Sequence, residues 1–250
     1  MRVLVAFATE SEFGPWRRLR AFRAAADANV YEAQIGENQV VAVVIGIGAG
    51  NARARIGKLL ESAPDCCISS GLAGGLKPGL SAGDVLAARA VCATGSPRLL
   101  DSDAQLVATA VRCGARAVDL FCTSRTVLVR AQDKAEMGLA ADAVEMESFG
   151  VIYEATGRGI PAAAIRAVSD PAGLDLPLDF NRVVDDRGAV RVPLLLGQLA
   201  RSPQRLPALA RFGWESSRAA RSLAEFLDRF VGQLSRPALR QPPFVETEKR

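Results

Sequence analysis

Short apolar runs separated by helical patterns are the feature that most constrains the fold of this chain. The run "RVLVAFA" at 2–8 shows no polar alternation, which is typical of a strand buried on both faces. A further buried strand is expected at 161–170, and amphipathic helical patterns lie between such runs. Strands that alternate with helices predict an α/β fold with a central mixed, mostly parallel β-sheet flanked by helices on both faces.

The expected elements fill most of the sequence. Strands are predicted at 2–8, 29–35, 39–47, 65–76, 84–91, 117–122, 126–130, 142–145 and 161–170, the fourth of which ends in a Gly-rich loop. Helices are predicted at 12–27, 51–62, 102–114, 131–139, 146–157 and 208–234. A chain of 250 residues suits one large domain, so we expect a single domain over residues 1–235 and a flexible tail over 236–250.

Composition excludes several functional classes. The chain has no histidine, so acid–base chemistry must use Asp, Glu, Lys, Tyr or Cys. The net charge of +4 owes much to arginines after residue 200, which we interpret as a solvated helix face with no nucleic-acid partner. The stretch "GIGAGNA" at 46–52 does not give G-x-G-x-x-G, and this argues against a dinucleotide site.

Cysteine usage and hydropathy indicate the cellular setting. The five cysteines include no C-x-x-C pair, and Cys66, Cys67 and Cys122 lie in apolar runs, where a thiol acts as a small hydrophobe. This pattern favours a reducing compartment without disulfides. No segment approaches the ~20 uncharged apolar residues of a membrane span, so we expect a cytoplasmic protein.

Acidic residues and one arginine gather at the predicted strand ends. Glu10 and Glu12 follow the first strand, and a Gly-rich stretch, "SSGLAGGL", occupies 69–76. The motif "VEMES" lies at 144–148 and "RAVSD" at 166–170. Ligands of such sheets bind at the carboxyl ends of the strands, so these groups are predicted to converge on one crevice.

Structural alternatives exist for the acidic residues. Glu10 and Glu12 could be first-turn acids that complement a helix dipole, and Asp170 before Pro171 could serve as a turn or cap residue. Arg166 is harder to explain in this way, because an arginine in a buried strand requires an anionic partner.

Taken together, these stretches resemble the purine nucleoside phosphorylase/nucleosidase superfamily. The nearest members in motif are the 5′-methylthioadenosine/S-adenosylhomocysteine nucleosidases, together with bacterial enzymes that act on futalosine or adenosylhopane. The resemblance covers about residues 1–180 and is carried, in chain order, by "ATESE", "GIG", "SGLAGGL…GD", "VEMES" and "RAVSD". It implies a homodimer that needs neither a metal nor an organic cofactor.

The resemblance also implies catalytic roles. Glu12 matches the general base that activates water, and Asp170 matches the acid that protonates the leaving base. Arg166 and Ser169 match residues that orient the water and the catalytic Asp. Cleavage of an N-glycosidic bond passes through an oxocarbenium-like sugar, so an acid is needed beside the base and a carboxylate beside the water.

Further positions match substrate-binding residues. Glu147 corresponds to the carboxylate that holds the ribose hydroxyls, whereas Glu145 is expected to reach outward or to cap locally. The other implied substrate-binding residues are Met146 under the sugar, Phe180 over the 5′ end, Ile47 as a nonpolar wall, Leu72, Ala73 and Gly74 of the Gly-rich stretch, and Val127.

Three departures from the family pattern bear on the substrate. Leu72 stands where methylthioadenosine nucleosidases have a serine, and Val127 stands in a region where the family often stacks a Phe on adenine. The segment 92–101 is shorter than in those enzymes, and the region after Phe180 looks like that of hopanoid-associated members.

The sequence therefore predicts an enzyme that hydrolyses an adenosine-type nucleoside with a modified 5′ group. Water is favoured over phosphate as the nucleophile because "SSGLAGGL" contains no arginine to capture an anion. The alternatives are cleavage of adenosylhopane in hopanoid synthesis, futalosine hydrolysis, and nucleoside binding without catalysis.

Overall fold

The computed structural model describes residues 1–183, 194, 197 and 203–235. The strands are Arg2–Phe7 (β1), Arg23–Ala24 (β2), Val30–Ile35 (β3), Asn38–Val44 (β4), Cys66–Gly75 (β5), Val85–Ala93 (β6), Leu99–Asp101 (β7), Arg116–Thr123 (β8), Ala143–Glu145 (β9) and Ala162–Asp170 (β10). The helices are Glu10–Leu19 (α1), Ala49–Leu60 (α2), Ala104–Arg112 (α3), Ala131–Met137 (α4), Ser148–Thr156 (α5), Phe180–Val183 (α6) and Leu206–Gln233 (α8), with a 3-10 turn at Pro203–Arg205.

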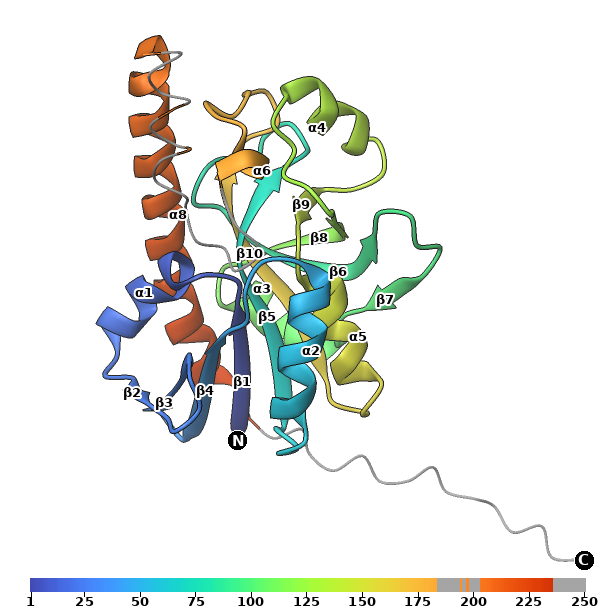
Figure 1. Cartoon of the computed structure of the whole chain (residues 1–250). Helices are drawn as coiled ribbons and strands as arrows, with labels where there is room; N and C mark the ends of the chain where they lie inside the picture. The colour runs from blue at the N-terminus through green and yellow to red at the C-terminus, as the bar shows by residue number, and fades with distance from the viewer. Residues whose placement is uncertain (184–193, 195–196, 198–202, 236–250) are drawn as a thin grey trace, which may run out of the picture.

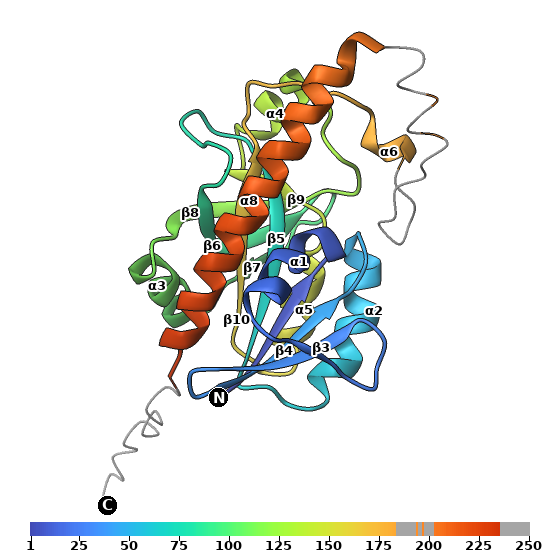
Figure 2. The ribbon, with the colours of Figure 1, turned by 90° about the vertical axis from the view of Figure 1, so that its left-hand side faces the viewer.

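The strands form one mixed sheet in the order β10-β6-β8-β9-β5-β1-β4-β3-β2, with β7 added beside β6. Strand β10 also pairs with β5, so this part of the sheet closes on itself. Helices α1, α3 and α8 cover one face, and α2 and α5 cover the other (Figures 1 and 2). The predicted fold class is confirmed.

Helix α8 anchors the first of these layers. An apolar stripe of α8 is buried over the C-terminal half of the helix, where Leu223, Phe226 and Phe230 pack against the sheet. The rings of Phe226 and Phe230 stack with centroids 5.7 Å apart. Complete burial of such a side chain contributes about 1.5–3 kcal/mol to folding. The N-terminal half continues beyond the sheet toward α6 (Figure 2).

Strand β5 changes partners along its length, and this opens the sheet. Its first half, through Ser69, pairs with β1, whereas Gly74 and Gly75 pair with β9. Between these two ladders the backbone of residues 70–73 faces the end of β1 without a strand partner on that side, within the described part of the chain. Backbone donors in such a gap are available to side chains.

The end predicted for the first helix is wrong. The helix expected at 12–27 ends at Leu19, and the chain turns back as β2 to pair with β3. Phe22 still reaches Phe13 and Trp16, at centroid distances of 5.1 and 5.0 Å, but it does so from the turn. Tertiary packing of the aromatic rings thus replaces the helical continuation that the apolar spacing indicated.

Other predictions fail around the site itself. The strand expected at 126–130 is irregular, because the N–H and C=O of Val127 bond with the side-chain amide of Asn181 at 2.8 and 3.0 Å. The predicted Gly-rich loop is instead the second half of β5. Strands β2 and β7 were not predicted, and the proposed tail at 236–250 lies outside the described residues.

Candidate active site

A cavity of about 260 Å³ lies at the opening beside β5. It is bordered by residues of all four predicted segments, at 8–12, 69–76, 144–148 and 166–170, so the chain brings these segments together. The sequence-predicted residues that line it are Glu12, Ile47, Leu72, Ala73, Gly74, Val127, Met146, Glu147, Ser169, Asp170 and Phe180. Arg166 is not part of the lining and lies behind it, in contact with Glu147.

Several lining residues were not predicted from the sequence. Most are apolar, or small and polar, and extend the wall already predicted: Ala8, Thr9, Thr126, Leu128, Val144, Leu176 and Phe212. Lys134 is different, because it places a buried cation in the cavity wall. Its segment, "AQDKAEM", reads as an ordinary surface helix, and no sequence signal marks the lysine.

Glu12 is oriented by backbone donors from two segments. It lies in the first turn of α1, where Thr9 N donates to Oε2 at 2.9 Å. Leu72 N, in the unpaired stretch of β5, donates to Oε1 at 2.8 Å. Oε2 also accepts from Thr9 Oγ1 at 3.2 Å, whereas Oε1 keeps a lone pair with which the carboxylate can accept a proton from a ligand in the cavity. Glu12 is therefore a first-turn acid, as the structural alternative held, and also a cavity residue.

Gly71 allows Glu12 and Arg166 to approach β5 closely. A Cβ at this position would lie 2.4 Å from Arg166 Nη1 and 2.6 Å from Glu12 Oε1. The φ of Gly71 is +144°, which L side chains rarely adopt. Both steric limits select glycine, so the Gly-rich composition here reflects crowding by functional side chains.

Arg166 is the cation of a buried ion network. It is 1% exposed and donates through Nη2 to Glu145 Oε2 at 2.6 Å and to Glu147 Oε2 at 3.3 Å. Nη1 donates to Ser70 O at 3.1 Å. The predicted anionic partner of Arg166 is thus a pair of glutamates.

Glu145 has a structural role inside the protein. Its Oε2 accepts hydrogen bonds from Glu147 N at 2.9 Å and Ser148 N at 2.7 Å, at the start of α5. Its Oε1 accepts from Thr123 Oγ1. The expectation of a local cap is confirmed, and the alternative that Glu145 reaches outward is wrong because its ion pair with Arg166 is buried.

Glu147 is a buried acid with few polar partners. It is 4% exposed, and Gly48 N donates to its Oε1 at 2.9 Å. Burial raises the pKa of Glu147 to about 8, with Arg166 acting in the lowering direction and the charges of Glu145 and Glu12 in the raising direction. A ligand that donates hydrogen bonds to this carboxylate would favour its ionised form.

Asp170 ends β10 between two donors. Ser169 Oγ donates to Oδ1 at 2.5 Å, and Lys134 Nζ donates to Oδ2 at 2.5 Å. The backbone of Asp170 pairs with Gly74 of β5, where an added Cβ would lie 3.2 Å from Oδ2. Asp170 is therefore a strand-end residue held by an ion pair and not merely a turn residue.

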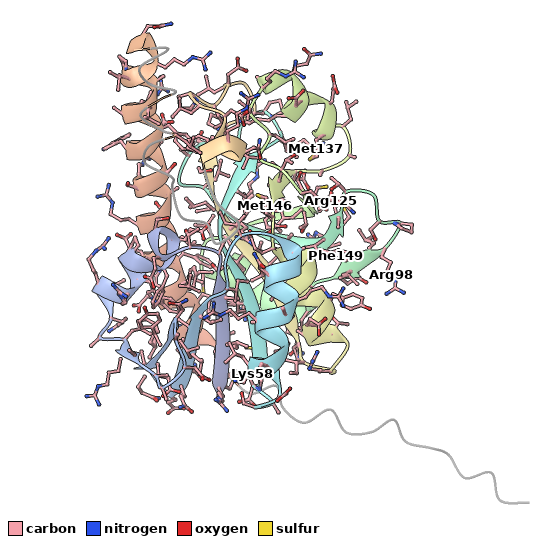
Figure 3. All side chains as sticks on the ribbon, in the orientation of Figure 1. Lys58, Arg98, Arg125, Met137, Met146 and Phe149 are labelled. Carbon is pink, nitrogen blue, oxygen red and sulfur yellow. The ribbon has the colours of Figure 1, made fainter. Side chains whose placement is uncertain are left out.

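The outer end of the cavity is apolar and aromatic. The centroids of the Phe180 and Phe212 rings lie 5.1 Å apart, and this contact joins α6 to the N-terminal half of α8. Figure 3 shows Met146 near α6 at the carboxyl end of the sheet. A wider hollow continues outward past Met146 and Phe180, and Arg125 forms part of its wall.

The described residues hold neither a candidate metal cluster nor a membrane-spanning helix. Among residues 1–183, 194, 197 and 203–235, no cluster of three or more His, Cys, Asp or Glu side chains has an arrangement that could hold a metal ion. None of the helices in those ranges has the length and apolarity required to cross a membrane. The five cysteines are free thiols.

Comparison with known proteins places the chain among nucleoside-processing enzymes. Residues 3–200 match the model of the phosphorylase superfamily. The 5′-methylthioadenosine/S-adenosylhomocysteine nucleosidase of Shewanella halifaxensis is 30% identical over 194 residues, which cover 66% of this chain and 84% of that protein. The corresponding nucleosidase of Exiguobacterium is 27% identical over 187 residues, covering 64% of this chain and 79% of that protein.

Solved structures share the fold. The Campylobacter jejuni 5′-methylthioadenosine/S-adenosylhomocysteine nucleosidase superposes with a TM-score of 0.71 at 19% identity, covering 94% of this chain and 100% of that one. Futalosine hydrolase of Helicobacter pylori gives a TM-score of 0.71 at 16% identity, covering 94% and 98%.

We predict that Gly71→Ala destabilises the protein by more than backbone strain alone. Strain at positive φ costs on the order of 1–3 kcal/mol, and the clash with Arg166 and Glu12 adds to it. Gly79→Ala is the matched control, because Gly79 has a φ of +81° but open space around its Cβ position. Urea unfolding followed by circular dichroism gives both values. Equal losses for the two variants would contradict the crowding argument.

We also predict that the folding stability of Glu147→Gln, relative to that of the wild type, increases as the pH rises. The pKa of Glu147 is about 8 in the folded protein, against 4.5 for an ordinary Glu, so the folded state binds this proton more tightly than the unfolded state does. The resulting stability is present below the unfolded pKa and is lost as pH rises through the folded pKa. Glutamine has no such proton, so the stability of the variant relative to wild type should increase between about pH 5 and pH 9.

Glu154→Gln is the control on the same helix, with the opposite sign. A hydrogen bond from Arg158 lowers the pKa of Glu154, so this variant should lose stability at neutral pH and approach wild type in acid. Urea midpoints measured across the pH range test both variants. Parallel curves for wild type and Glu147→Gln would show that burial does not perturb Glu147.

Proposed function

The chain belongs to the phosphorylase superfamily, and from this premise we propose that it is a purine nucleosidase. The reaction is hydrolysis of the N-glycosidic bond of an adenosine-type nucleoside that carries a modified 5′ group. The observation that carries the proposal is the gathering of Glu12, Glu147 and Asp170 around one cavity.

The spacing of the acid and the base supports this reaction. Glu12 contacts β5 at Leu72, and Asp170 pairs with β5 at Gly74. Two residues of an extended strand span about 7 Å. A separation of that order leaves room for a sugar and an attacking water between two carboxyl groups.

The proposed reaction assigns one task to each acid. Glu12 takes a proton from water as the oxygen attacks C1′, and the bond between C1′ and N9 breaks. Asp170 delivers a proton to a ring nitrogen of the purine, which leaves as the neutral base. Glu147 accepts hydrogen bonds from the ribose hydroxyls, and its negative charge stabilises the cationic sugar. The products are the free base and the free sugar.

Water is the better nucleophile for this cavity. Arg166 is paired with Glu145 and Glu147, and Lys134 is paired with Asp170. In the described part of the chain, the cation in the cavity wall and the cation behind it are therefore both paired with carboxylates. A phosphate dianion would enter beside the four carboxyl groups of Glu12, Glu145, Glu147 and Asp170 with no unpaired cation in the wall, which is electrostatically unfavourable.

The aromatic end of the cavity favours an apolar 5′ group. The ring pair of Phe180 and Phe212 lines the cavity, and the family resemblance expects Phe180 over the 5′ end of the substrate. The wider hollow beyond it has room, as a second candidate, for a bulky substituent such as that of adenosylhopane. A carboxylate on the 5′ group would instead have to reach Arg125 in that outer hollow.

A binding protein without catalysis fits the geometry less well. A binder has no need of a base and an acid on different sides of one sugar-sized space. The proposed homodimer and cytoplasmic location rest on family likeness and composition, and they stay predictions.

The direct test is product analysis. Purified protein is incubated with methylthioadenosine, adenosylhomocysteine, adenosine, inosine and futalosine, with and without phosphate. We expect free base and free ribose product, with no dependence on phosphate. Formation of the ribose 1-phosphate would overturn the hydrolytic reaction, and release of base from none of the five would favour the binding protein or the adenosylhopane substrate.

Asp170→Asn and Glu12→Gln are each expected to lose roughly two or more orders of magnitude in kcat, as is typical when an acid or base is removed. Glu10→Gln is the matched control for Glu12→Gln, because Glu10 lies on the same helix turn and outside the cavity. Near-full activity of Asp170→Asn or Glu12→Gln would refute the role assigned to that residue.

The 5′ preference has its own test. A series of 5′-alkylthioadenosines should gain about fourfold in kcat/KM per added methylene, from about 0.8 kcal/mol of burial for each. Phe212→Ala should flatten this series, whereas Trp214→Ala, two residues on in α8 and 59% exposed, should not. A preference for adenosylhomocysteine over every alkyl analogue would reject the apolar 5′ group.

A further inference from the structure

Lys134 is a buried cation that has no assigned task in the proposed reaction. It is 1% exposed and lies in α4, at the wall of the cavity. Nζ donates to Asp170 Oδ2 at 2.5 Å, to Leu174 O at 2.9 Å and to Pro171 O at 3.3 Å. A buried ammonium group without such partners would be strongly destabilising.

The hydrogen-bond capacity of Lys134 limits its role. An ammonium group has three N–H donors, and three acceptors are in place. None is left for a substrate atom such as a carbonyl oxygen on the base. Any effect of Lys134 on the reaction must therefore pass through Asp170 or through the chain segment that follows it.

Asp170 receives a donor on each oxygen. Lys134 holds Oδ2, and the Ser169 hydroxyl, which also lies 3.2 Å from Ala73 O, holds Oδ1. Donors on both oxygens match a carboxylate, which accepts hydrogen bonds but has no proton of its own to give. The leaving purine nevertheless needs a proton, and the nearest protein proton on Asp170 Oδ2 is the one on Lys134 Nζ.

We infer that Lys134 is a positioning residue that holds Asp170 toward the base and supplies the proton that Asp170 passes to the leaving purine. The inference rests on the proposed nucleosidase reaction. As the C1′–N9 bond breaks, a proton moves from Nζ to Oδ2, and Asp170 passes this proton on to the purine nitrogen and returns to its ionised form. The ammonium becomes an amine, the purine leaves neutral, and the amine is reprotonated from solvent after product release.

The inference predicts dependence on the leaving group. Lys134→Met should lower kcat on a purine nucleoside by about 10²-fold or more, the usual contribution of general acid catalysis. The same variant should cleave 4-nitrophenyl riboside at nearly the wild-type rate, because nitrophenolate leaves without a proton. Lys134→Arg keeps the charge and the donors but does not give up a proton, so it should hold Asp170 in place without recovering the purine activity.

The controls separate this role from simple packing. Lys77→Met removes another lysine that donates to a backbone carbonyl, that of Gly138, but does not line the cavity, and should leave both rates unchanged. Cleavage of the aryl riboside also reports that each variant is folded. Equal losses of Lys134→Met on the two substrates, or no loss on the purine, would overturn the inference. Failure of the wild type to release any purine would instead reject the proposed function.

Discussion

The buried guanidinium of Arg166 fixes the arrangement on which the site depends. It joins β10 to the backbone of β5 at Ser70, to Glu145 at the end of β9 and to Glu147 at the start of α5. Such a network contributes little net stability, because removing the charges from water offsets much of their attraction. It does determine where each group lies, since loss of one partner would leave another charge buried and unpaired. Buried charges as well as apolar packing therefore determine how these strands are arranged.

Acidic groups outnumber basic groups around the cavity. Four carboxyl groups border the cavity, from Glu12, Glu145, Glu147 and Asp170, whereas the adjacent cations are Lys134 and Arg166. A surplus of negative charge in a poorly hydrated space favours a cationic sugar and disfavours an anionic nucleophile. The opening in the sheet supplies the other requirement. Because β5 leaves β1 before it meets β9, the N–H of Leu72 is free to hold Glu12 instead of a strand neighbour.

The sequence predicted the parts of this site that strand ends determine. Glu12, Glu147 and Asp170 directly follow or end apolar runs, and the carboxyl ends of parallel strands meet at one edge of a sheet. It failed where side chains override local pattern. The segment 126–130 has the β-branched composition of a strand, but its apolar residues line the cavity and its backbone is held by Asn181. Lys134 was missed because burial of one lysine on a polar helix depends on a carboxylate 36 residues away.

The buried carboxyl group of Glu147 lowers the stability of the folded protein when no ligand is bound. The pKa of Glu147 is raised because burial disfavours its charged form, and the hydrogen bonds from Gly48 and Arg166 do not fully offset this cost. Ribose hydroxyls are neutral donors of the kind that such a carboxylate lacks, so sugar binding would ionise Glu147 and supply its missing partners. The same event brings negative charge beside C1′, where positive charge develops during bond cleavage. Burial of Glu147 thus lowers the stability of the empty fold and prepares a charge that the reaction uses.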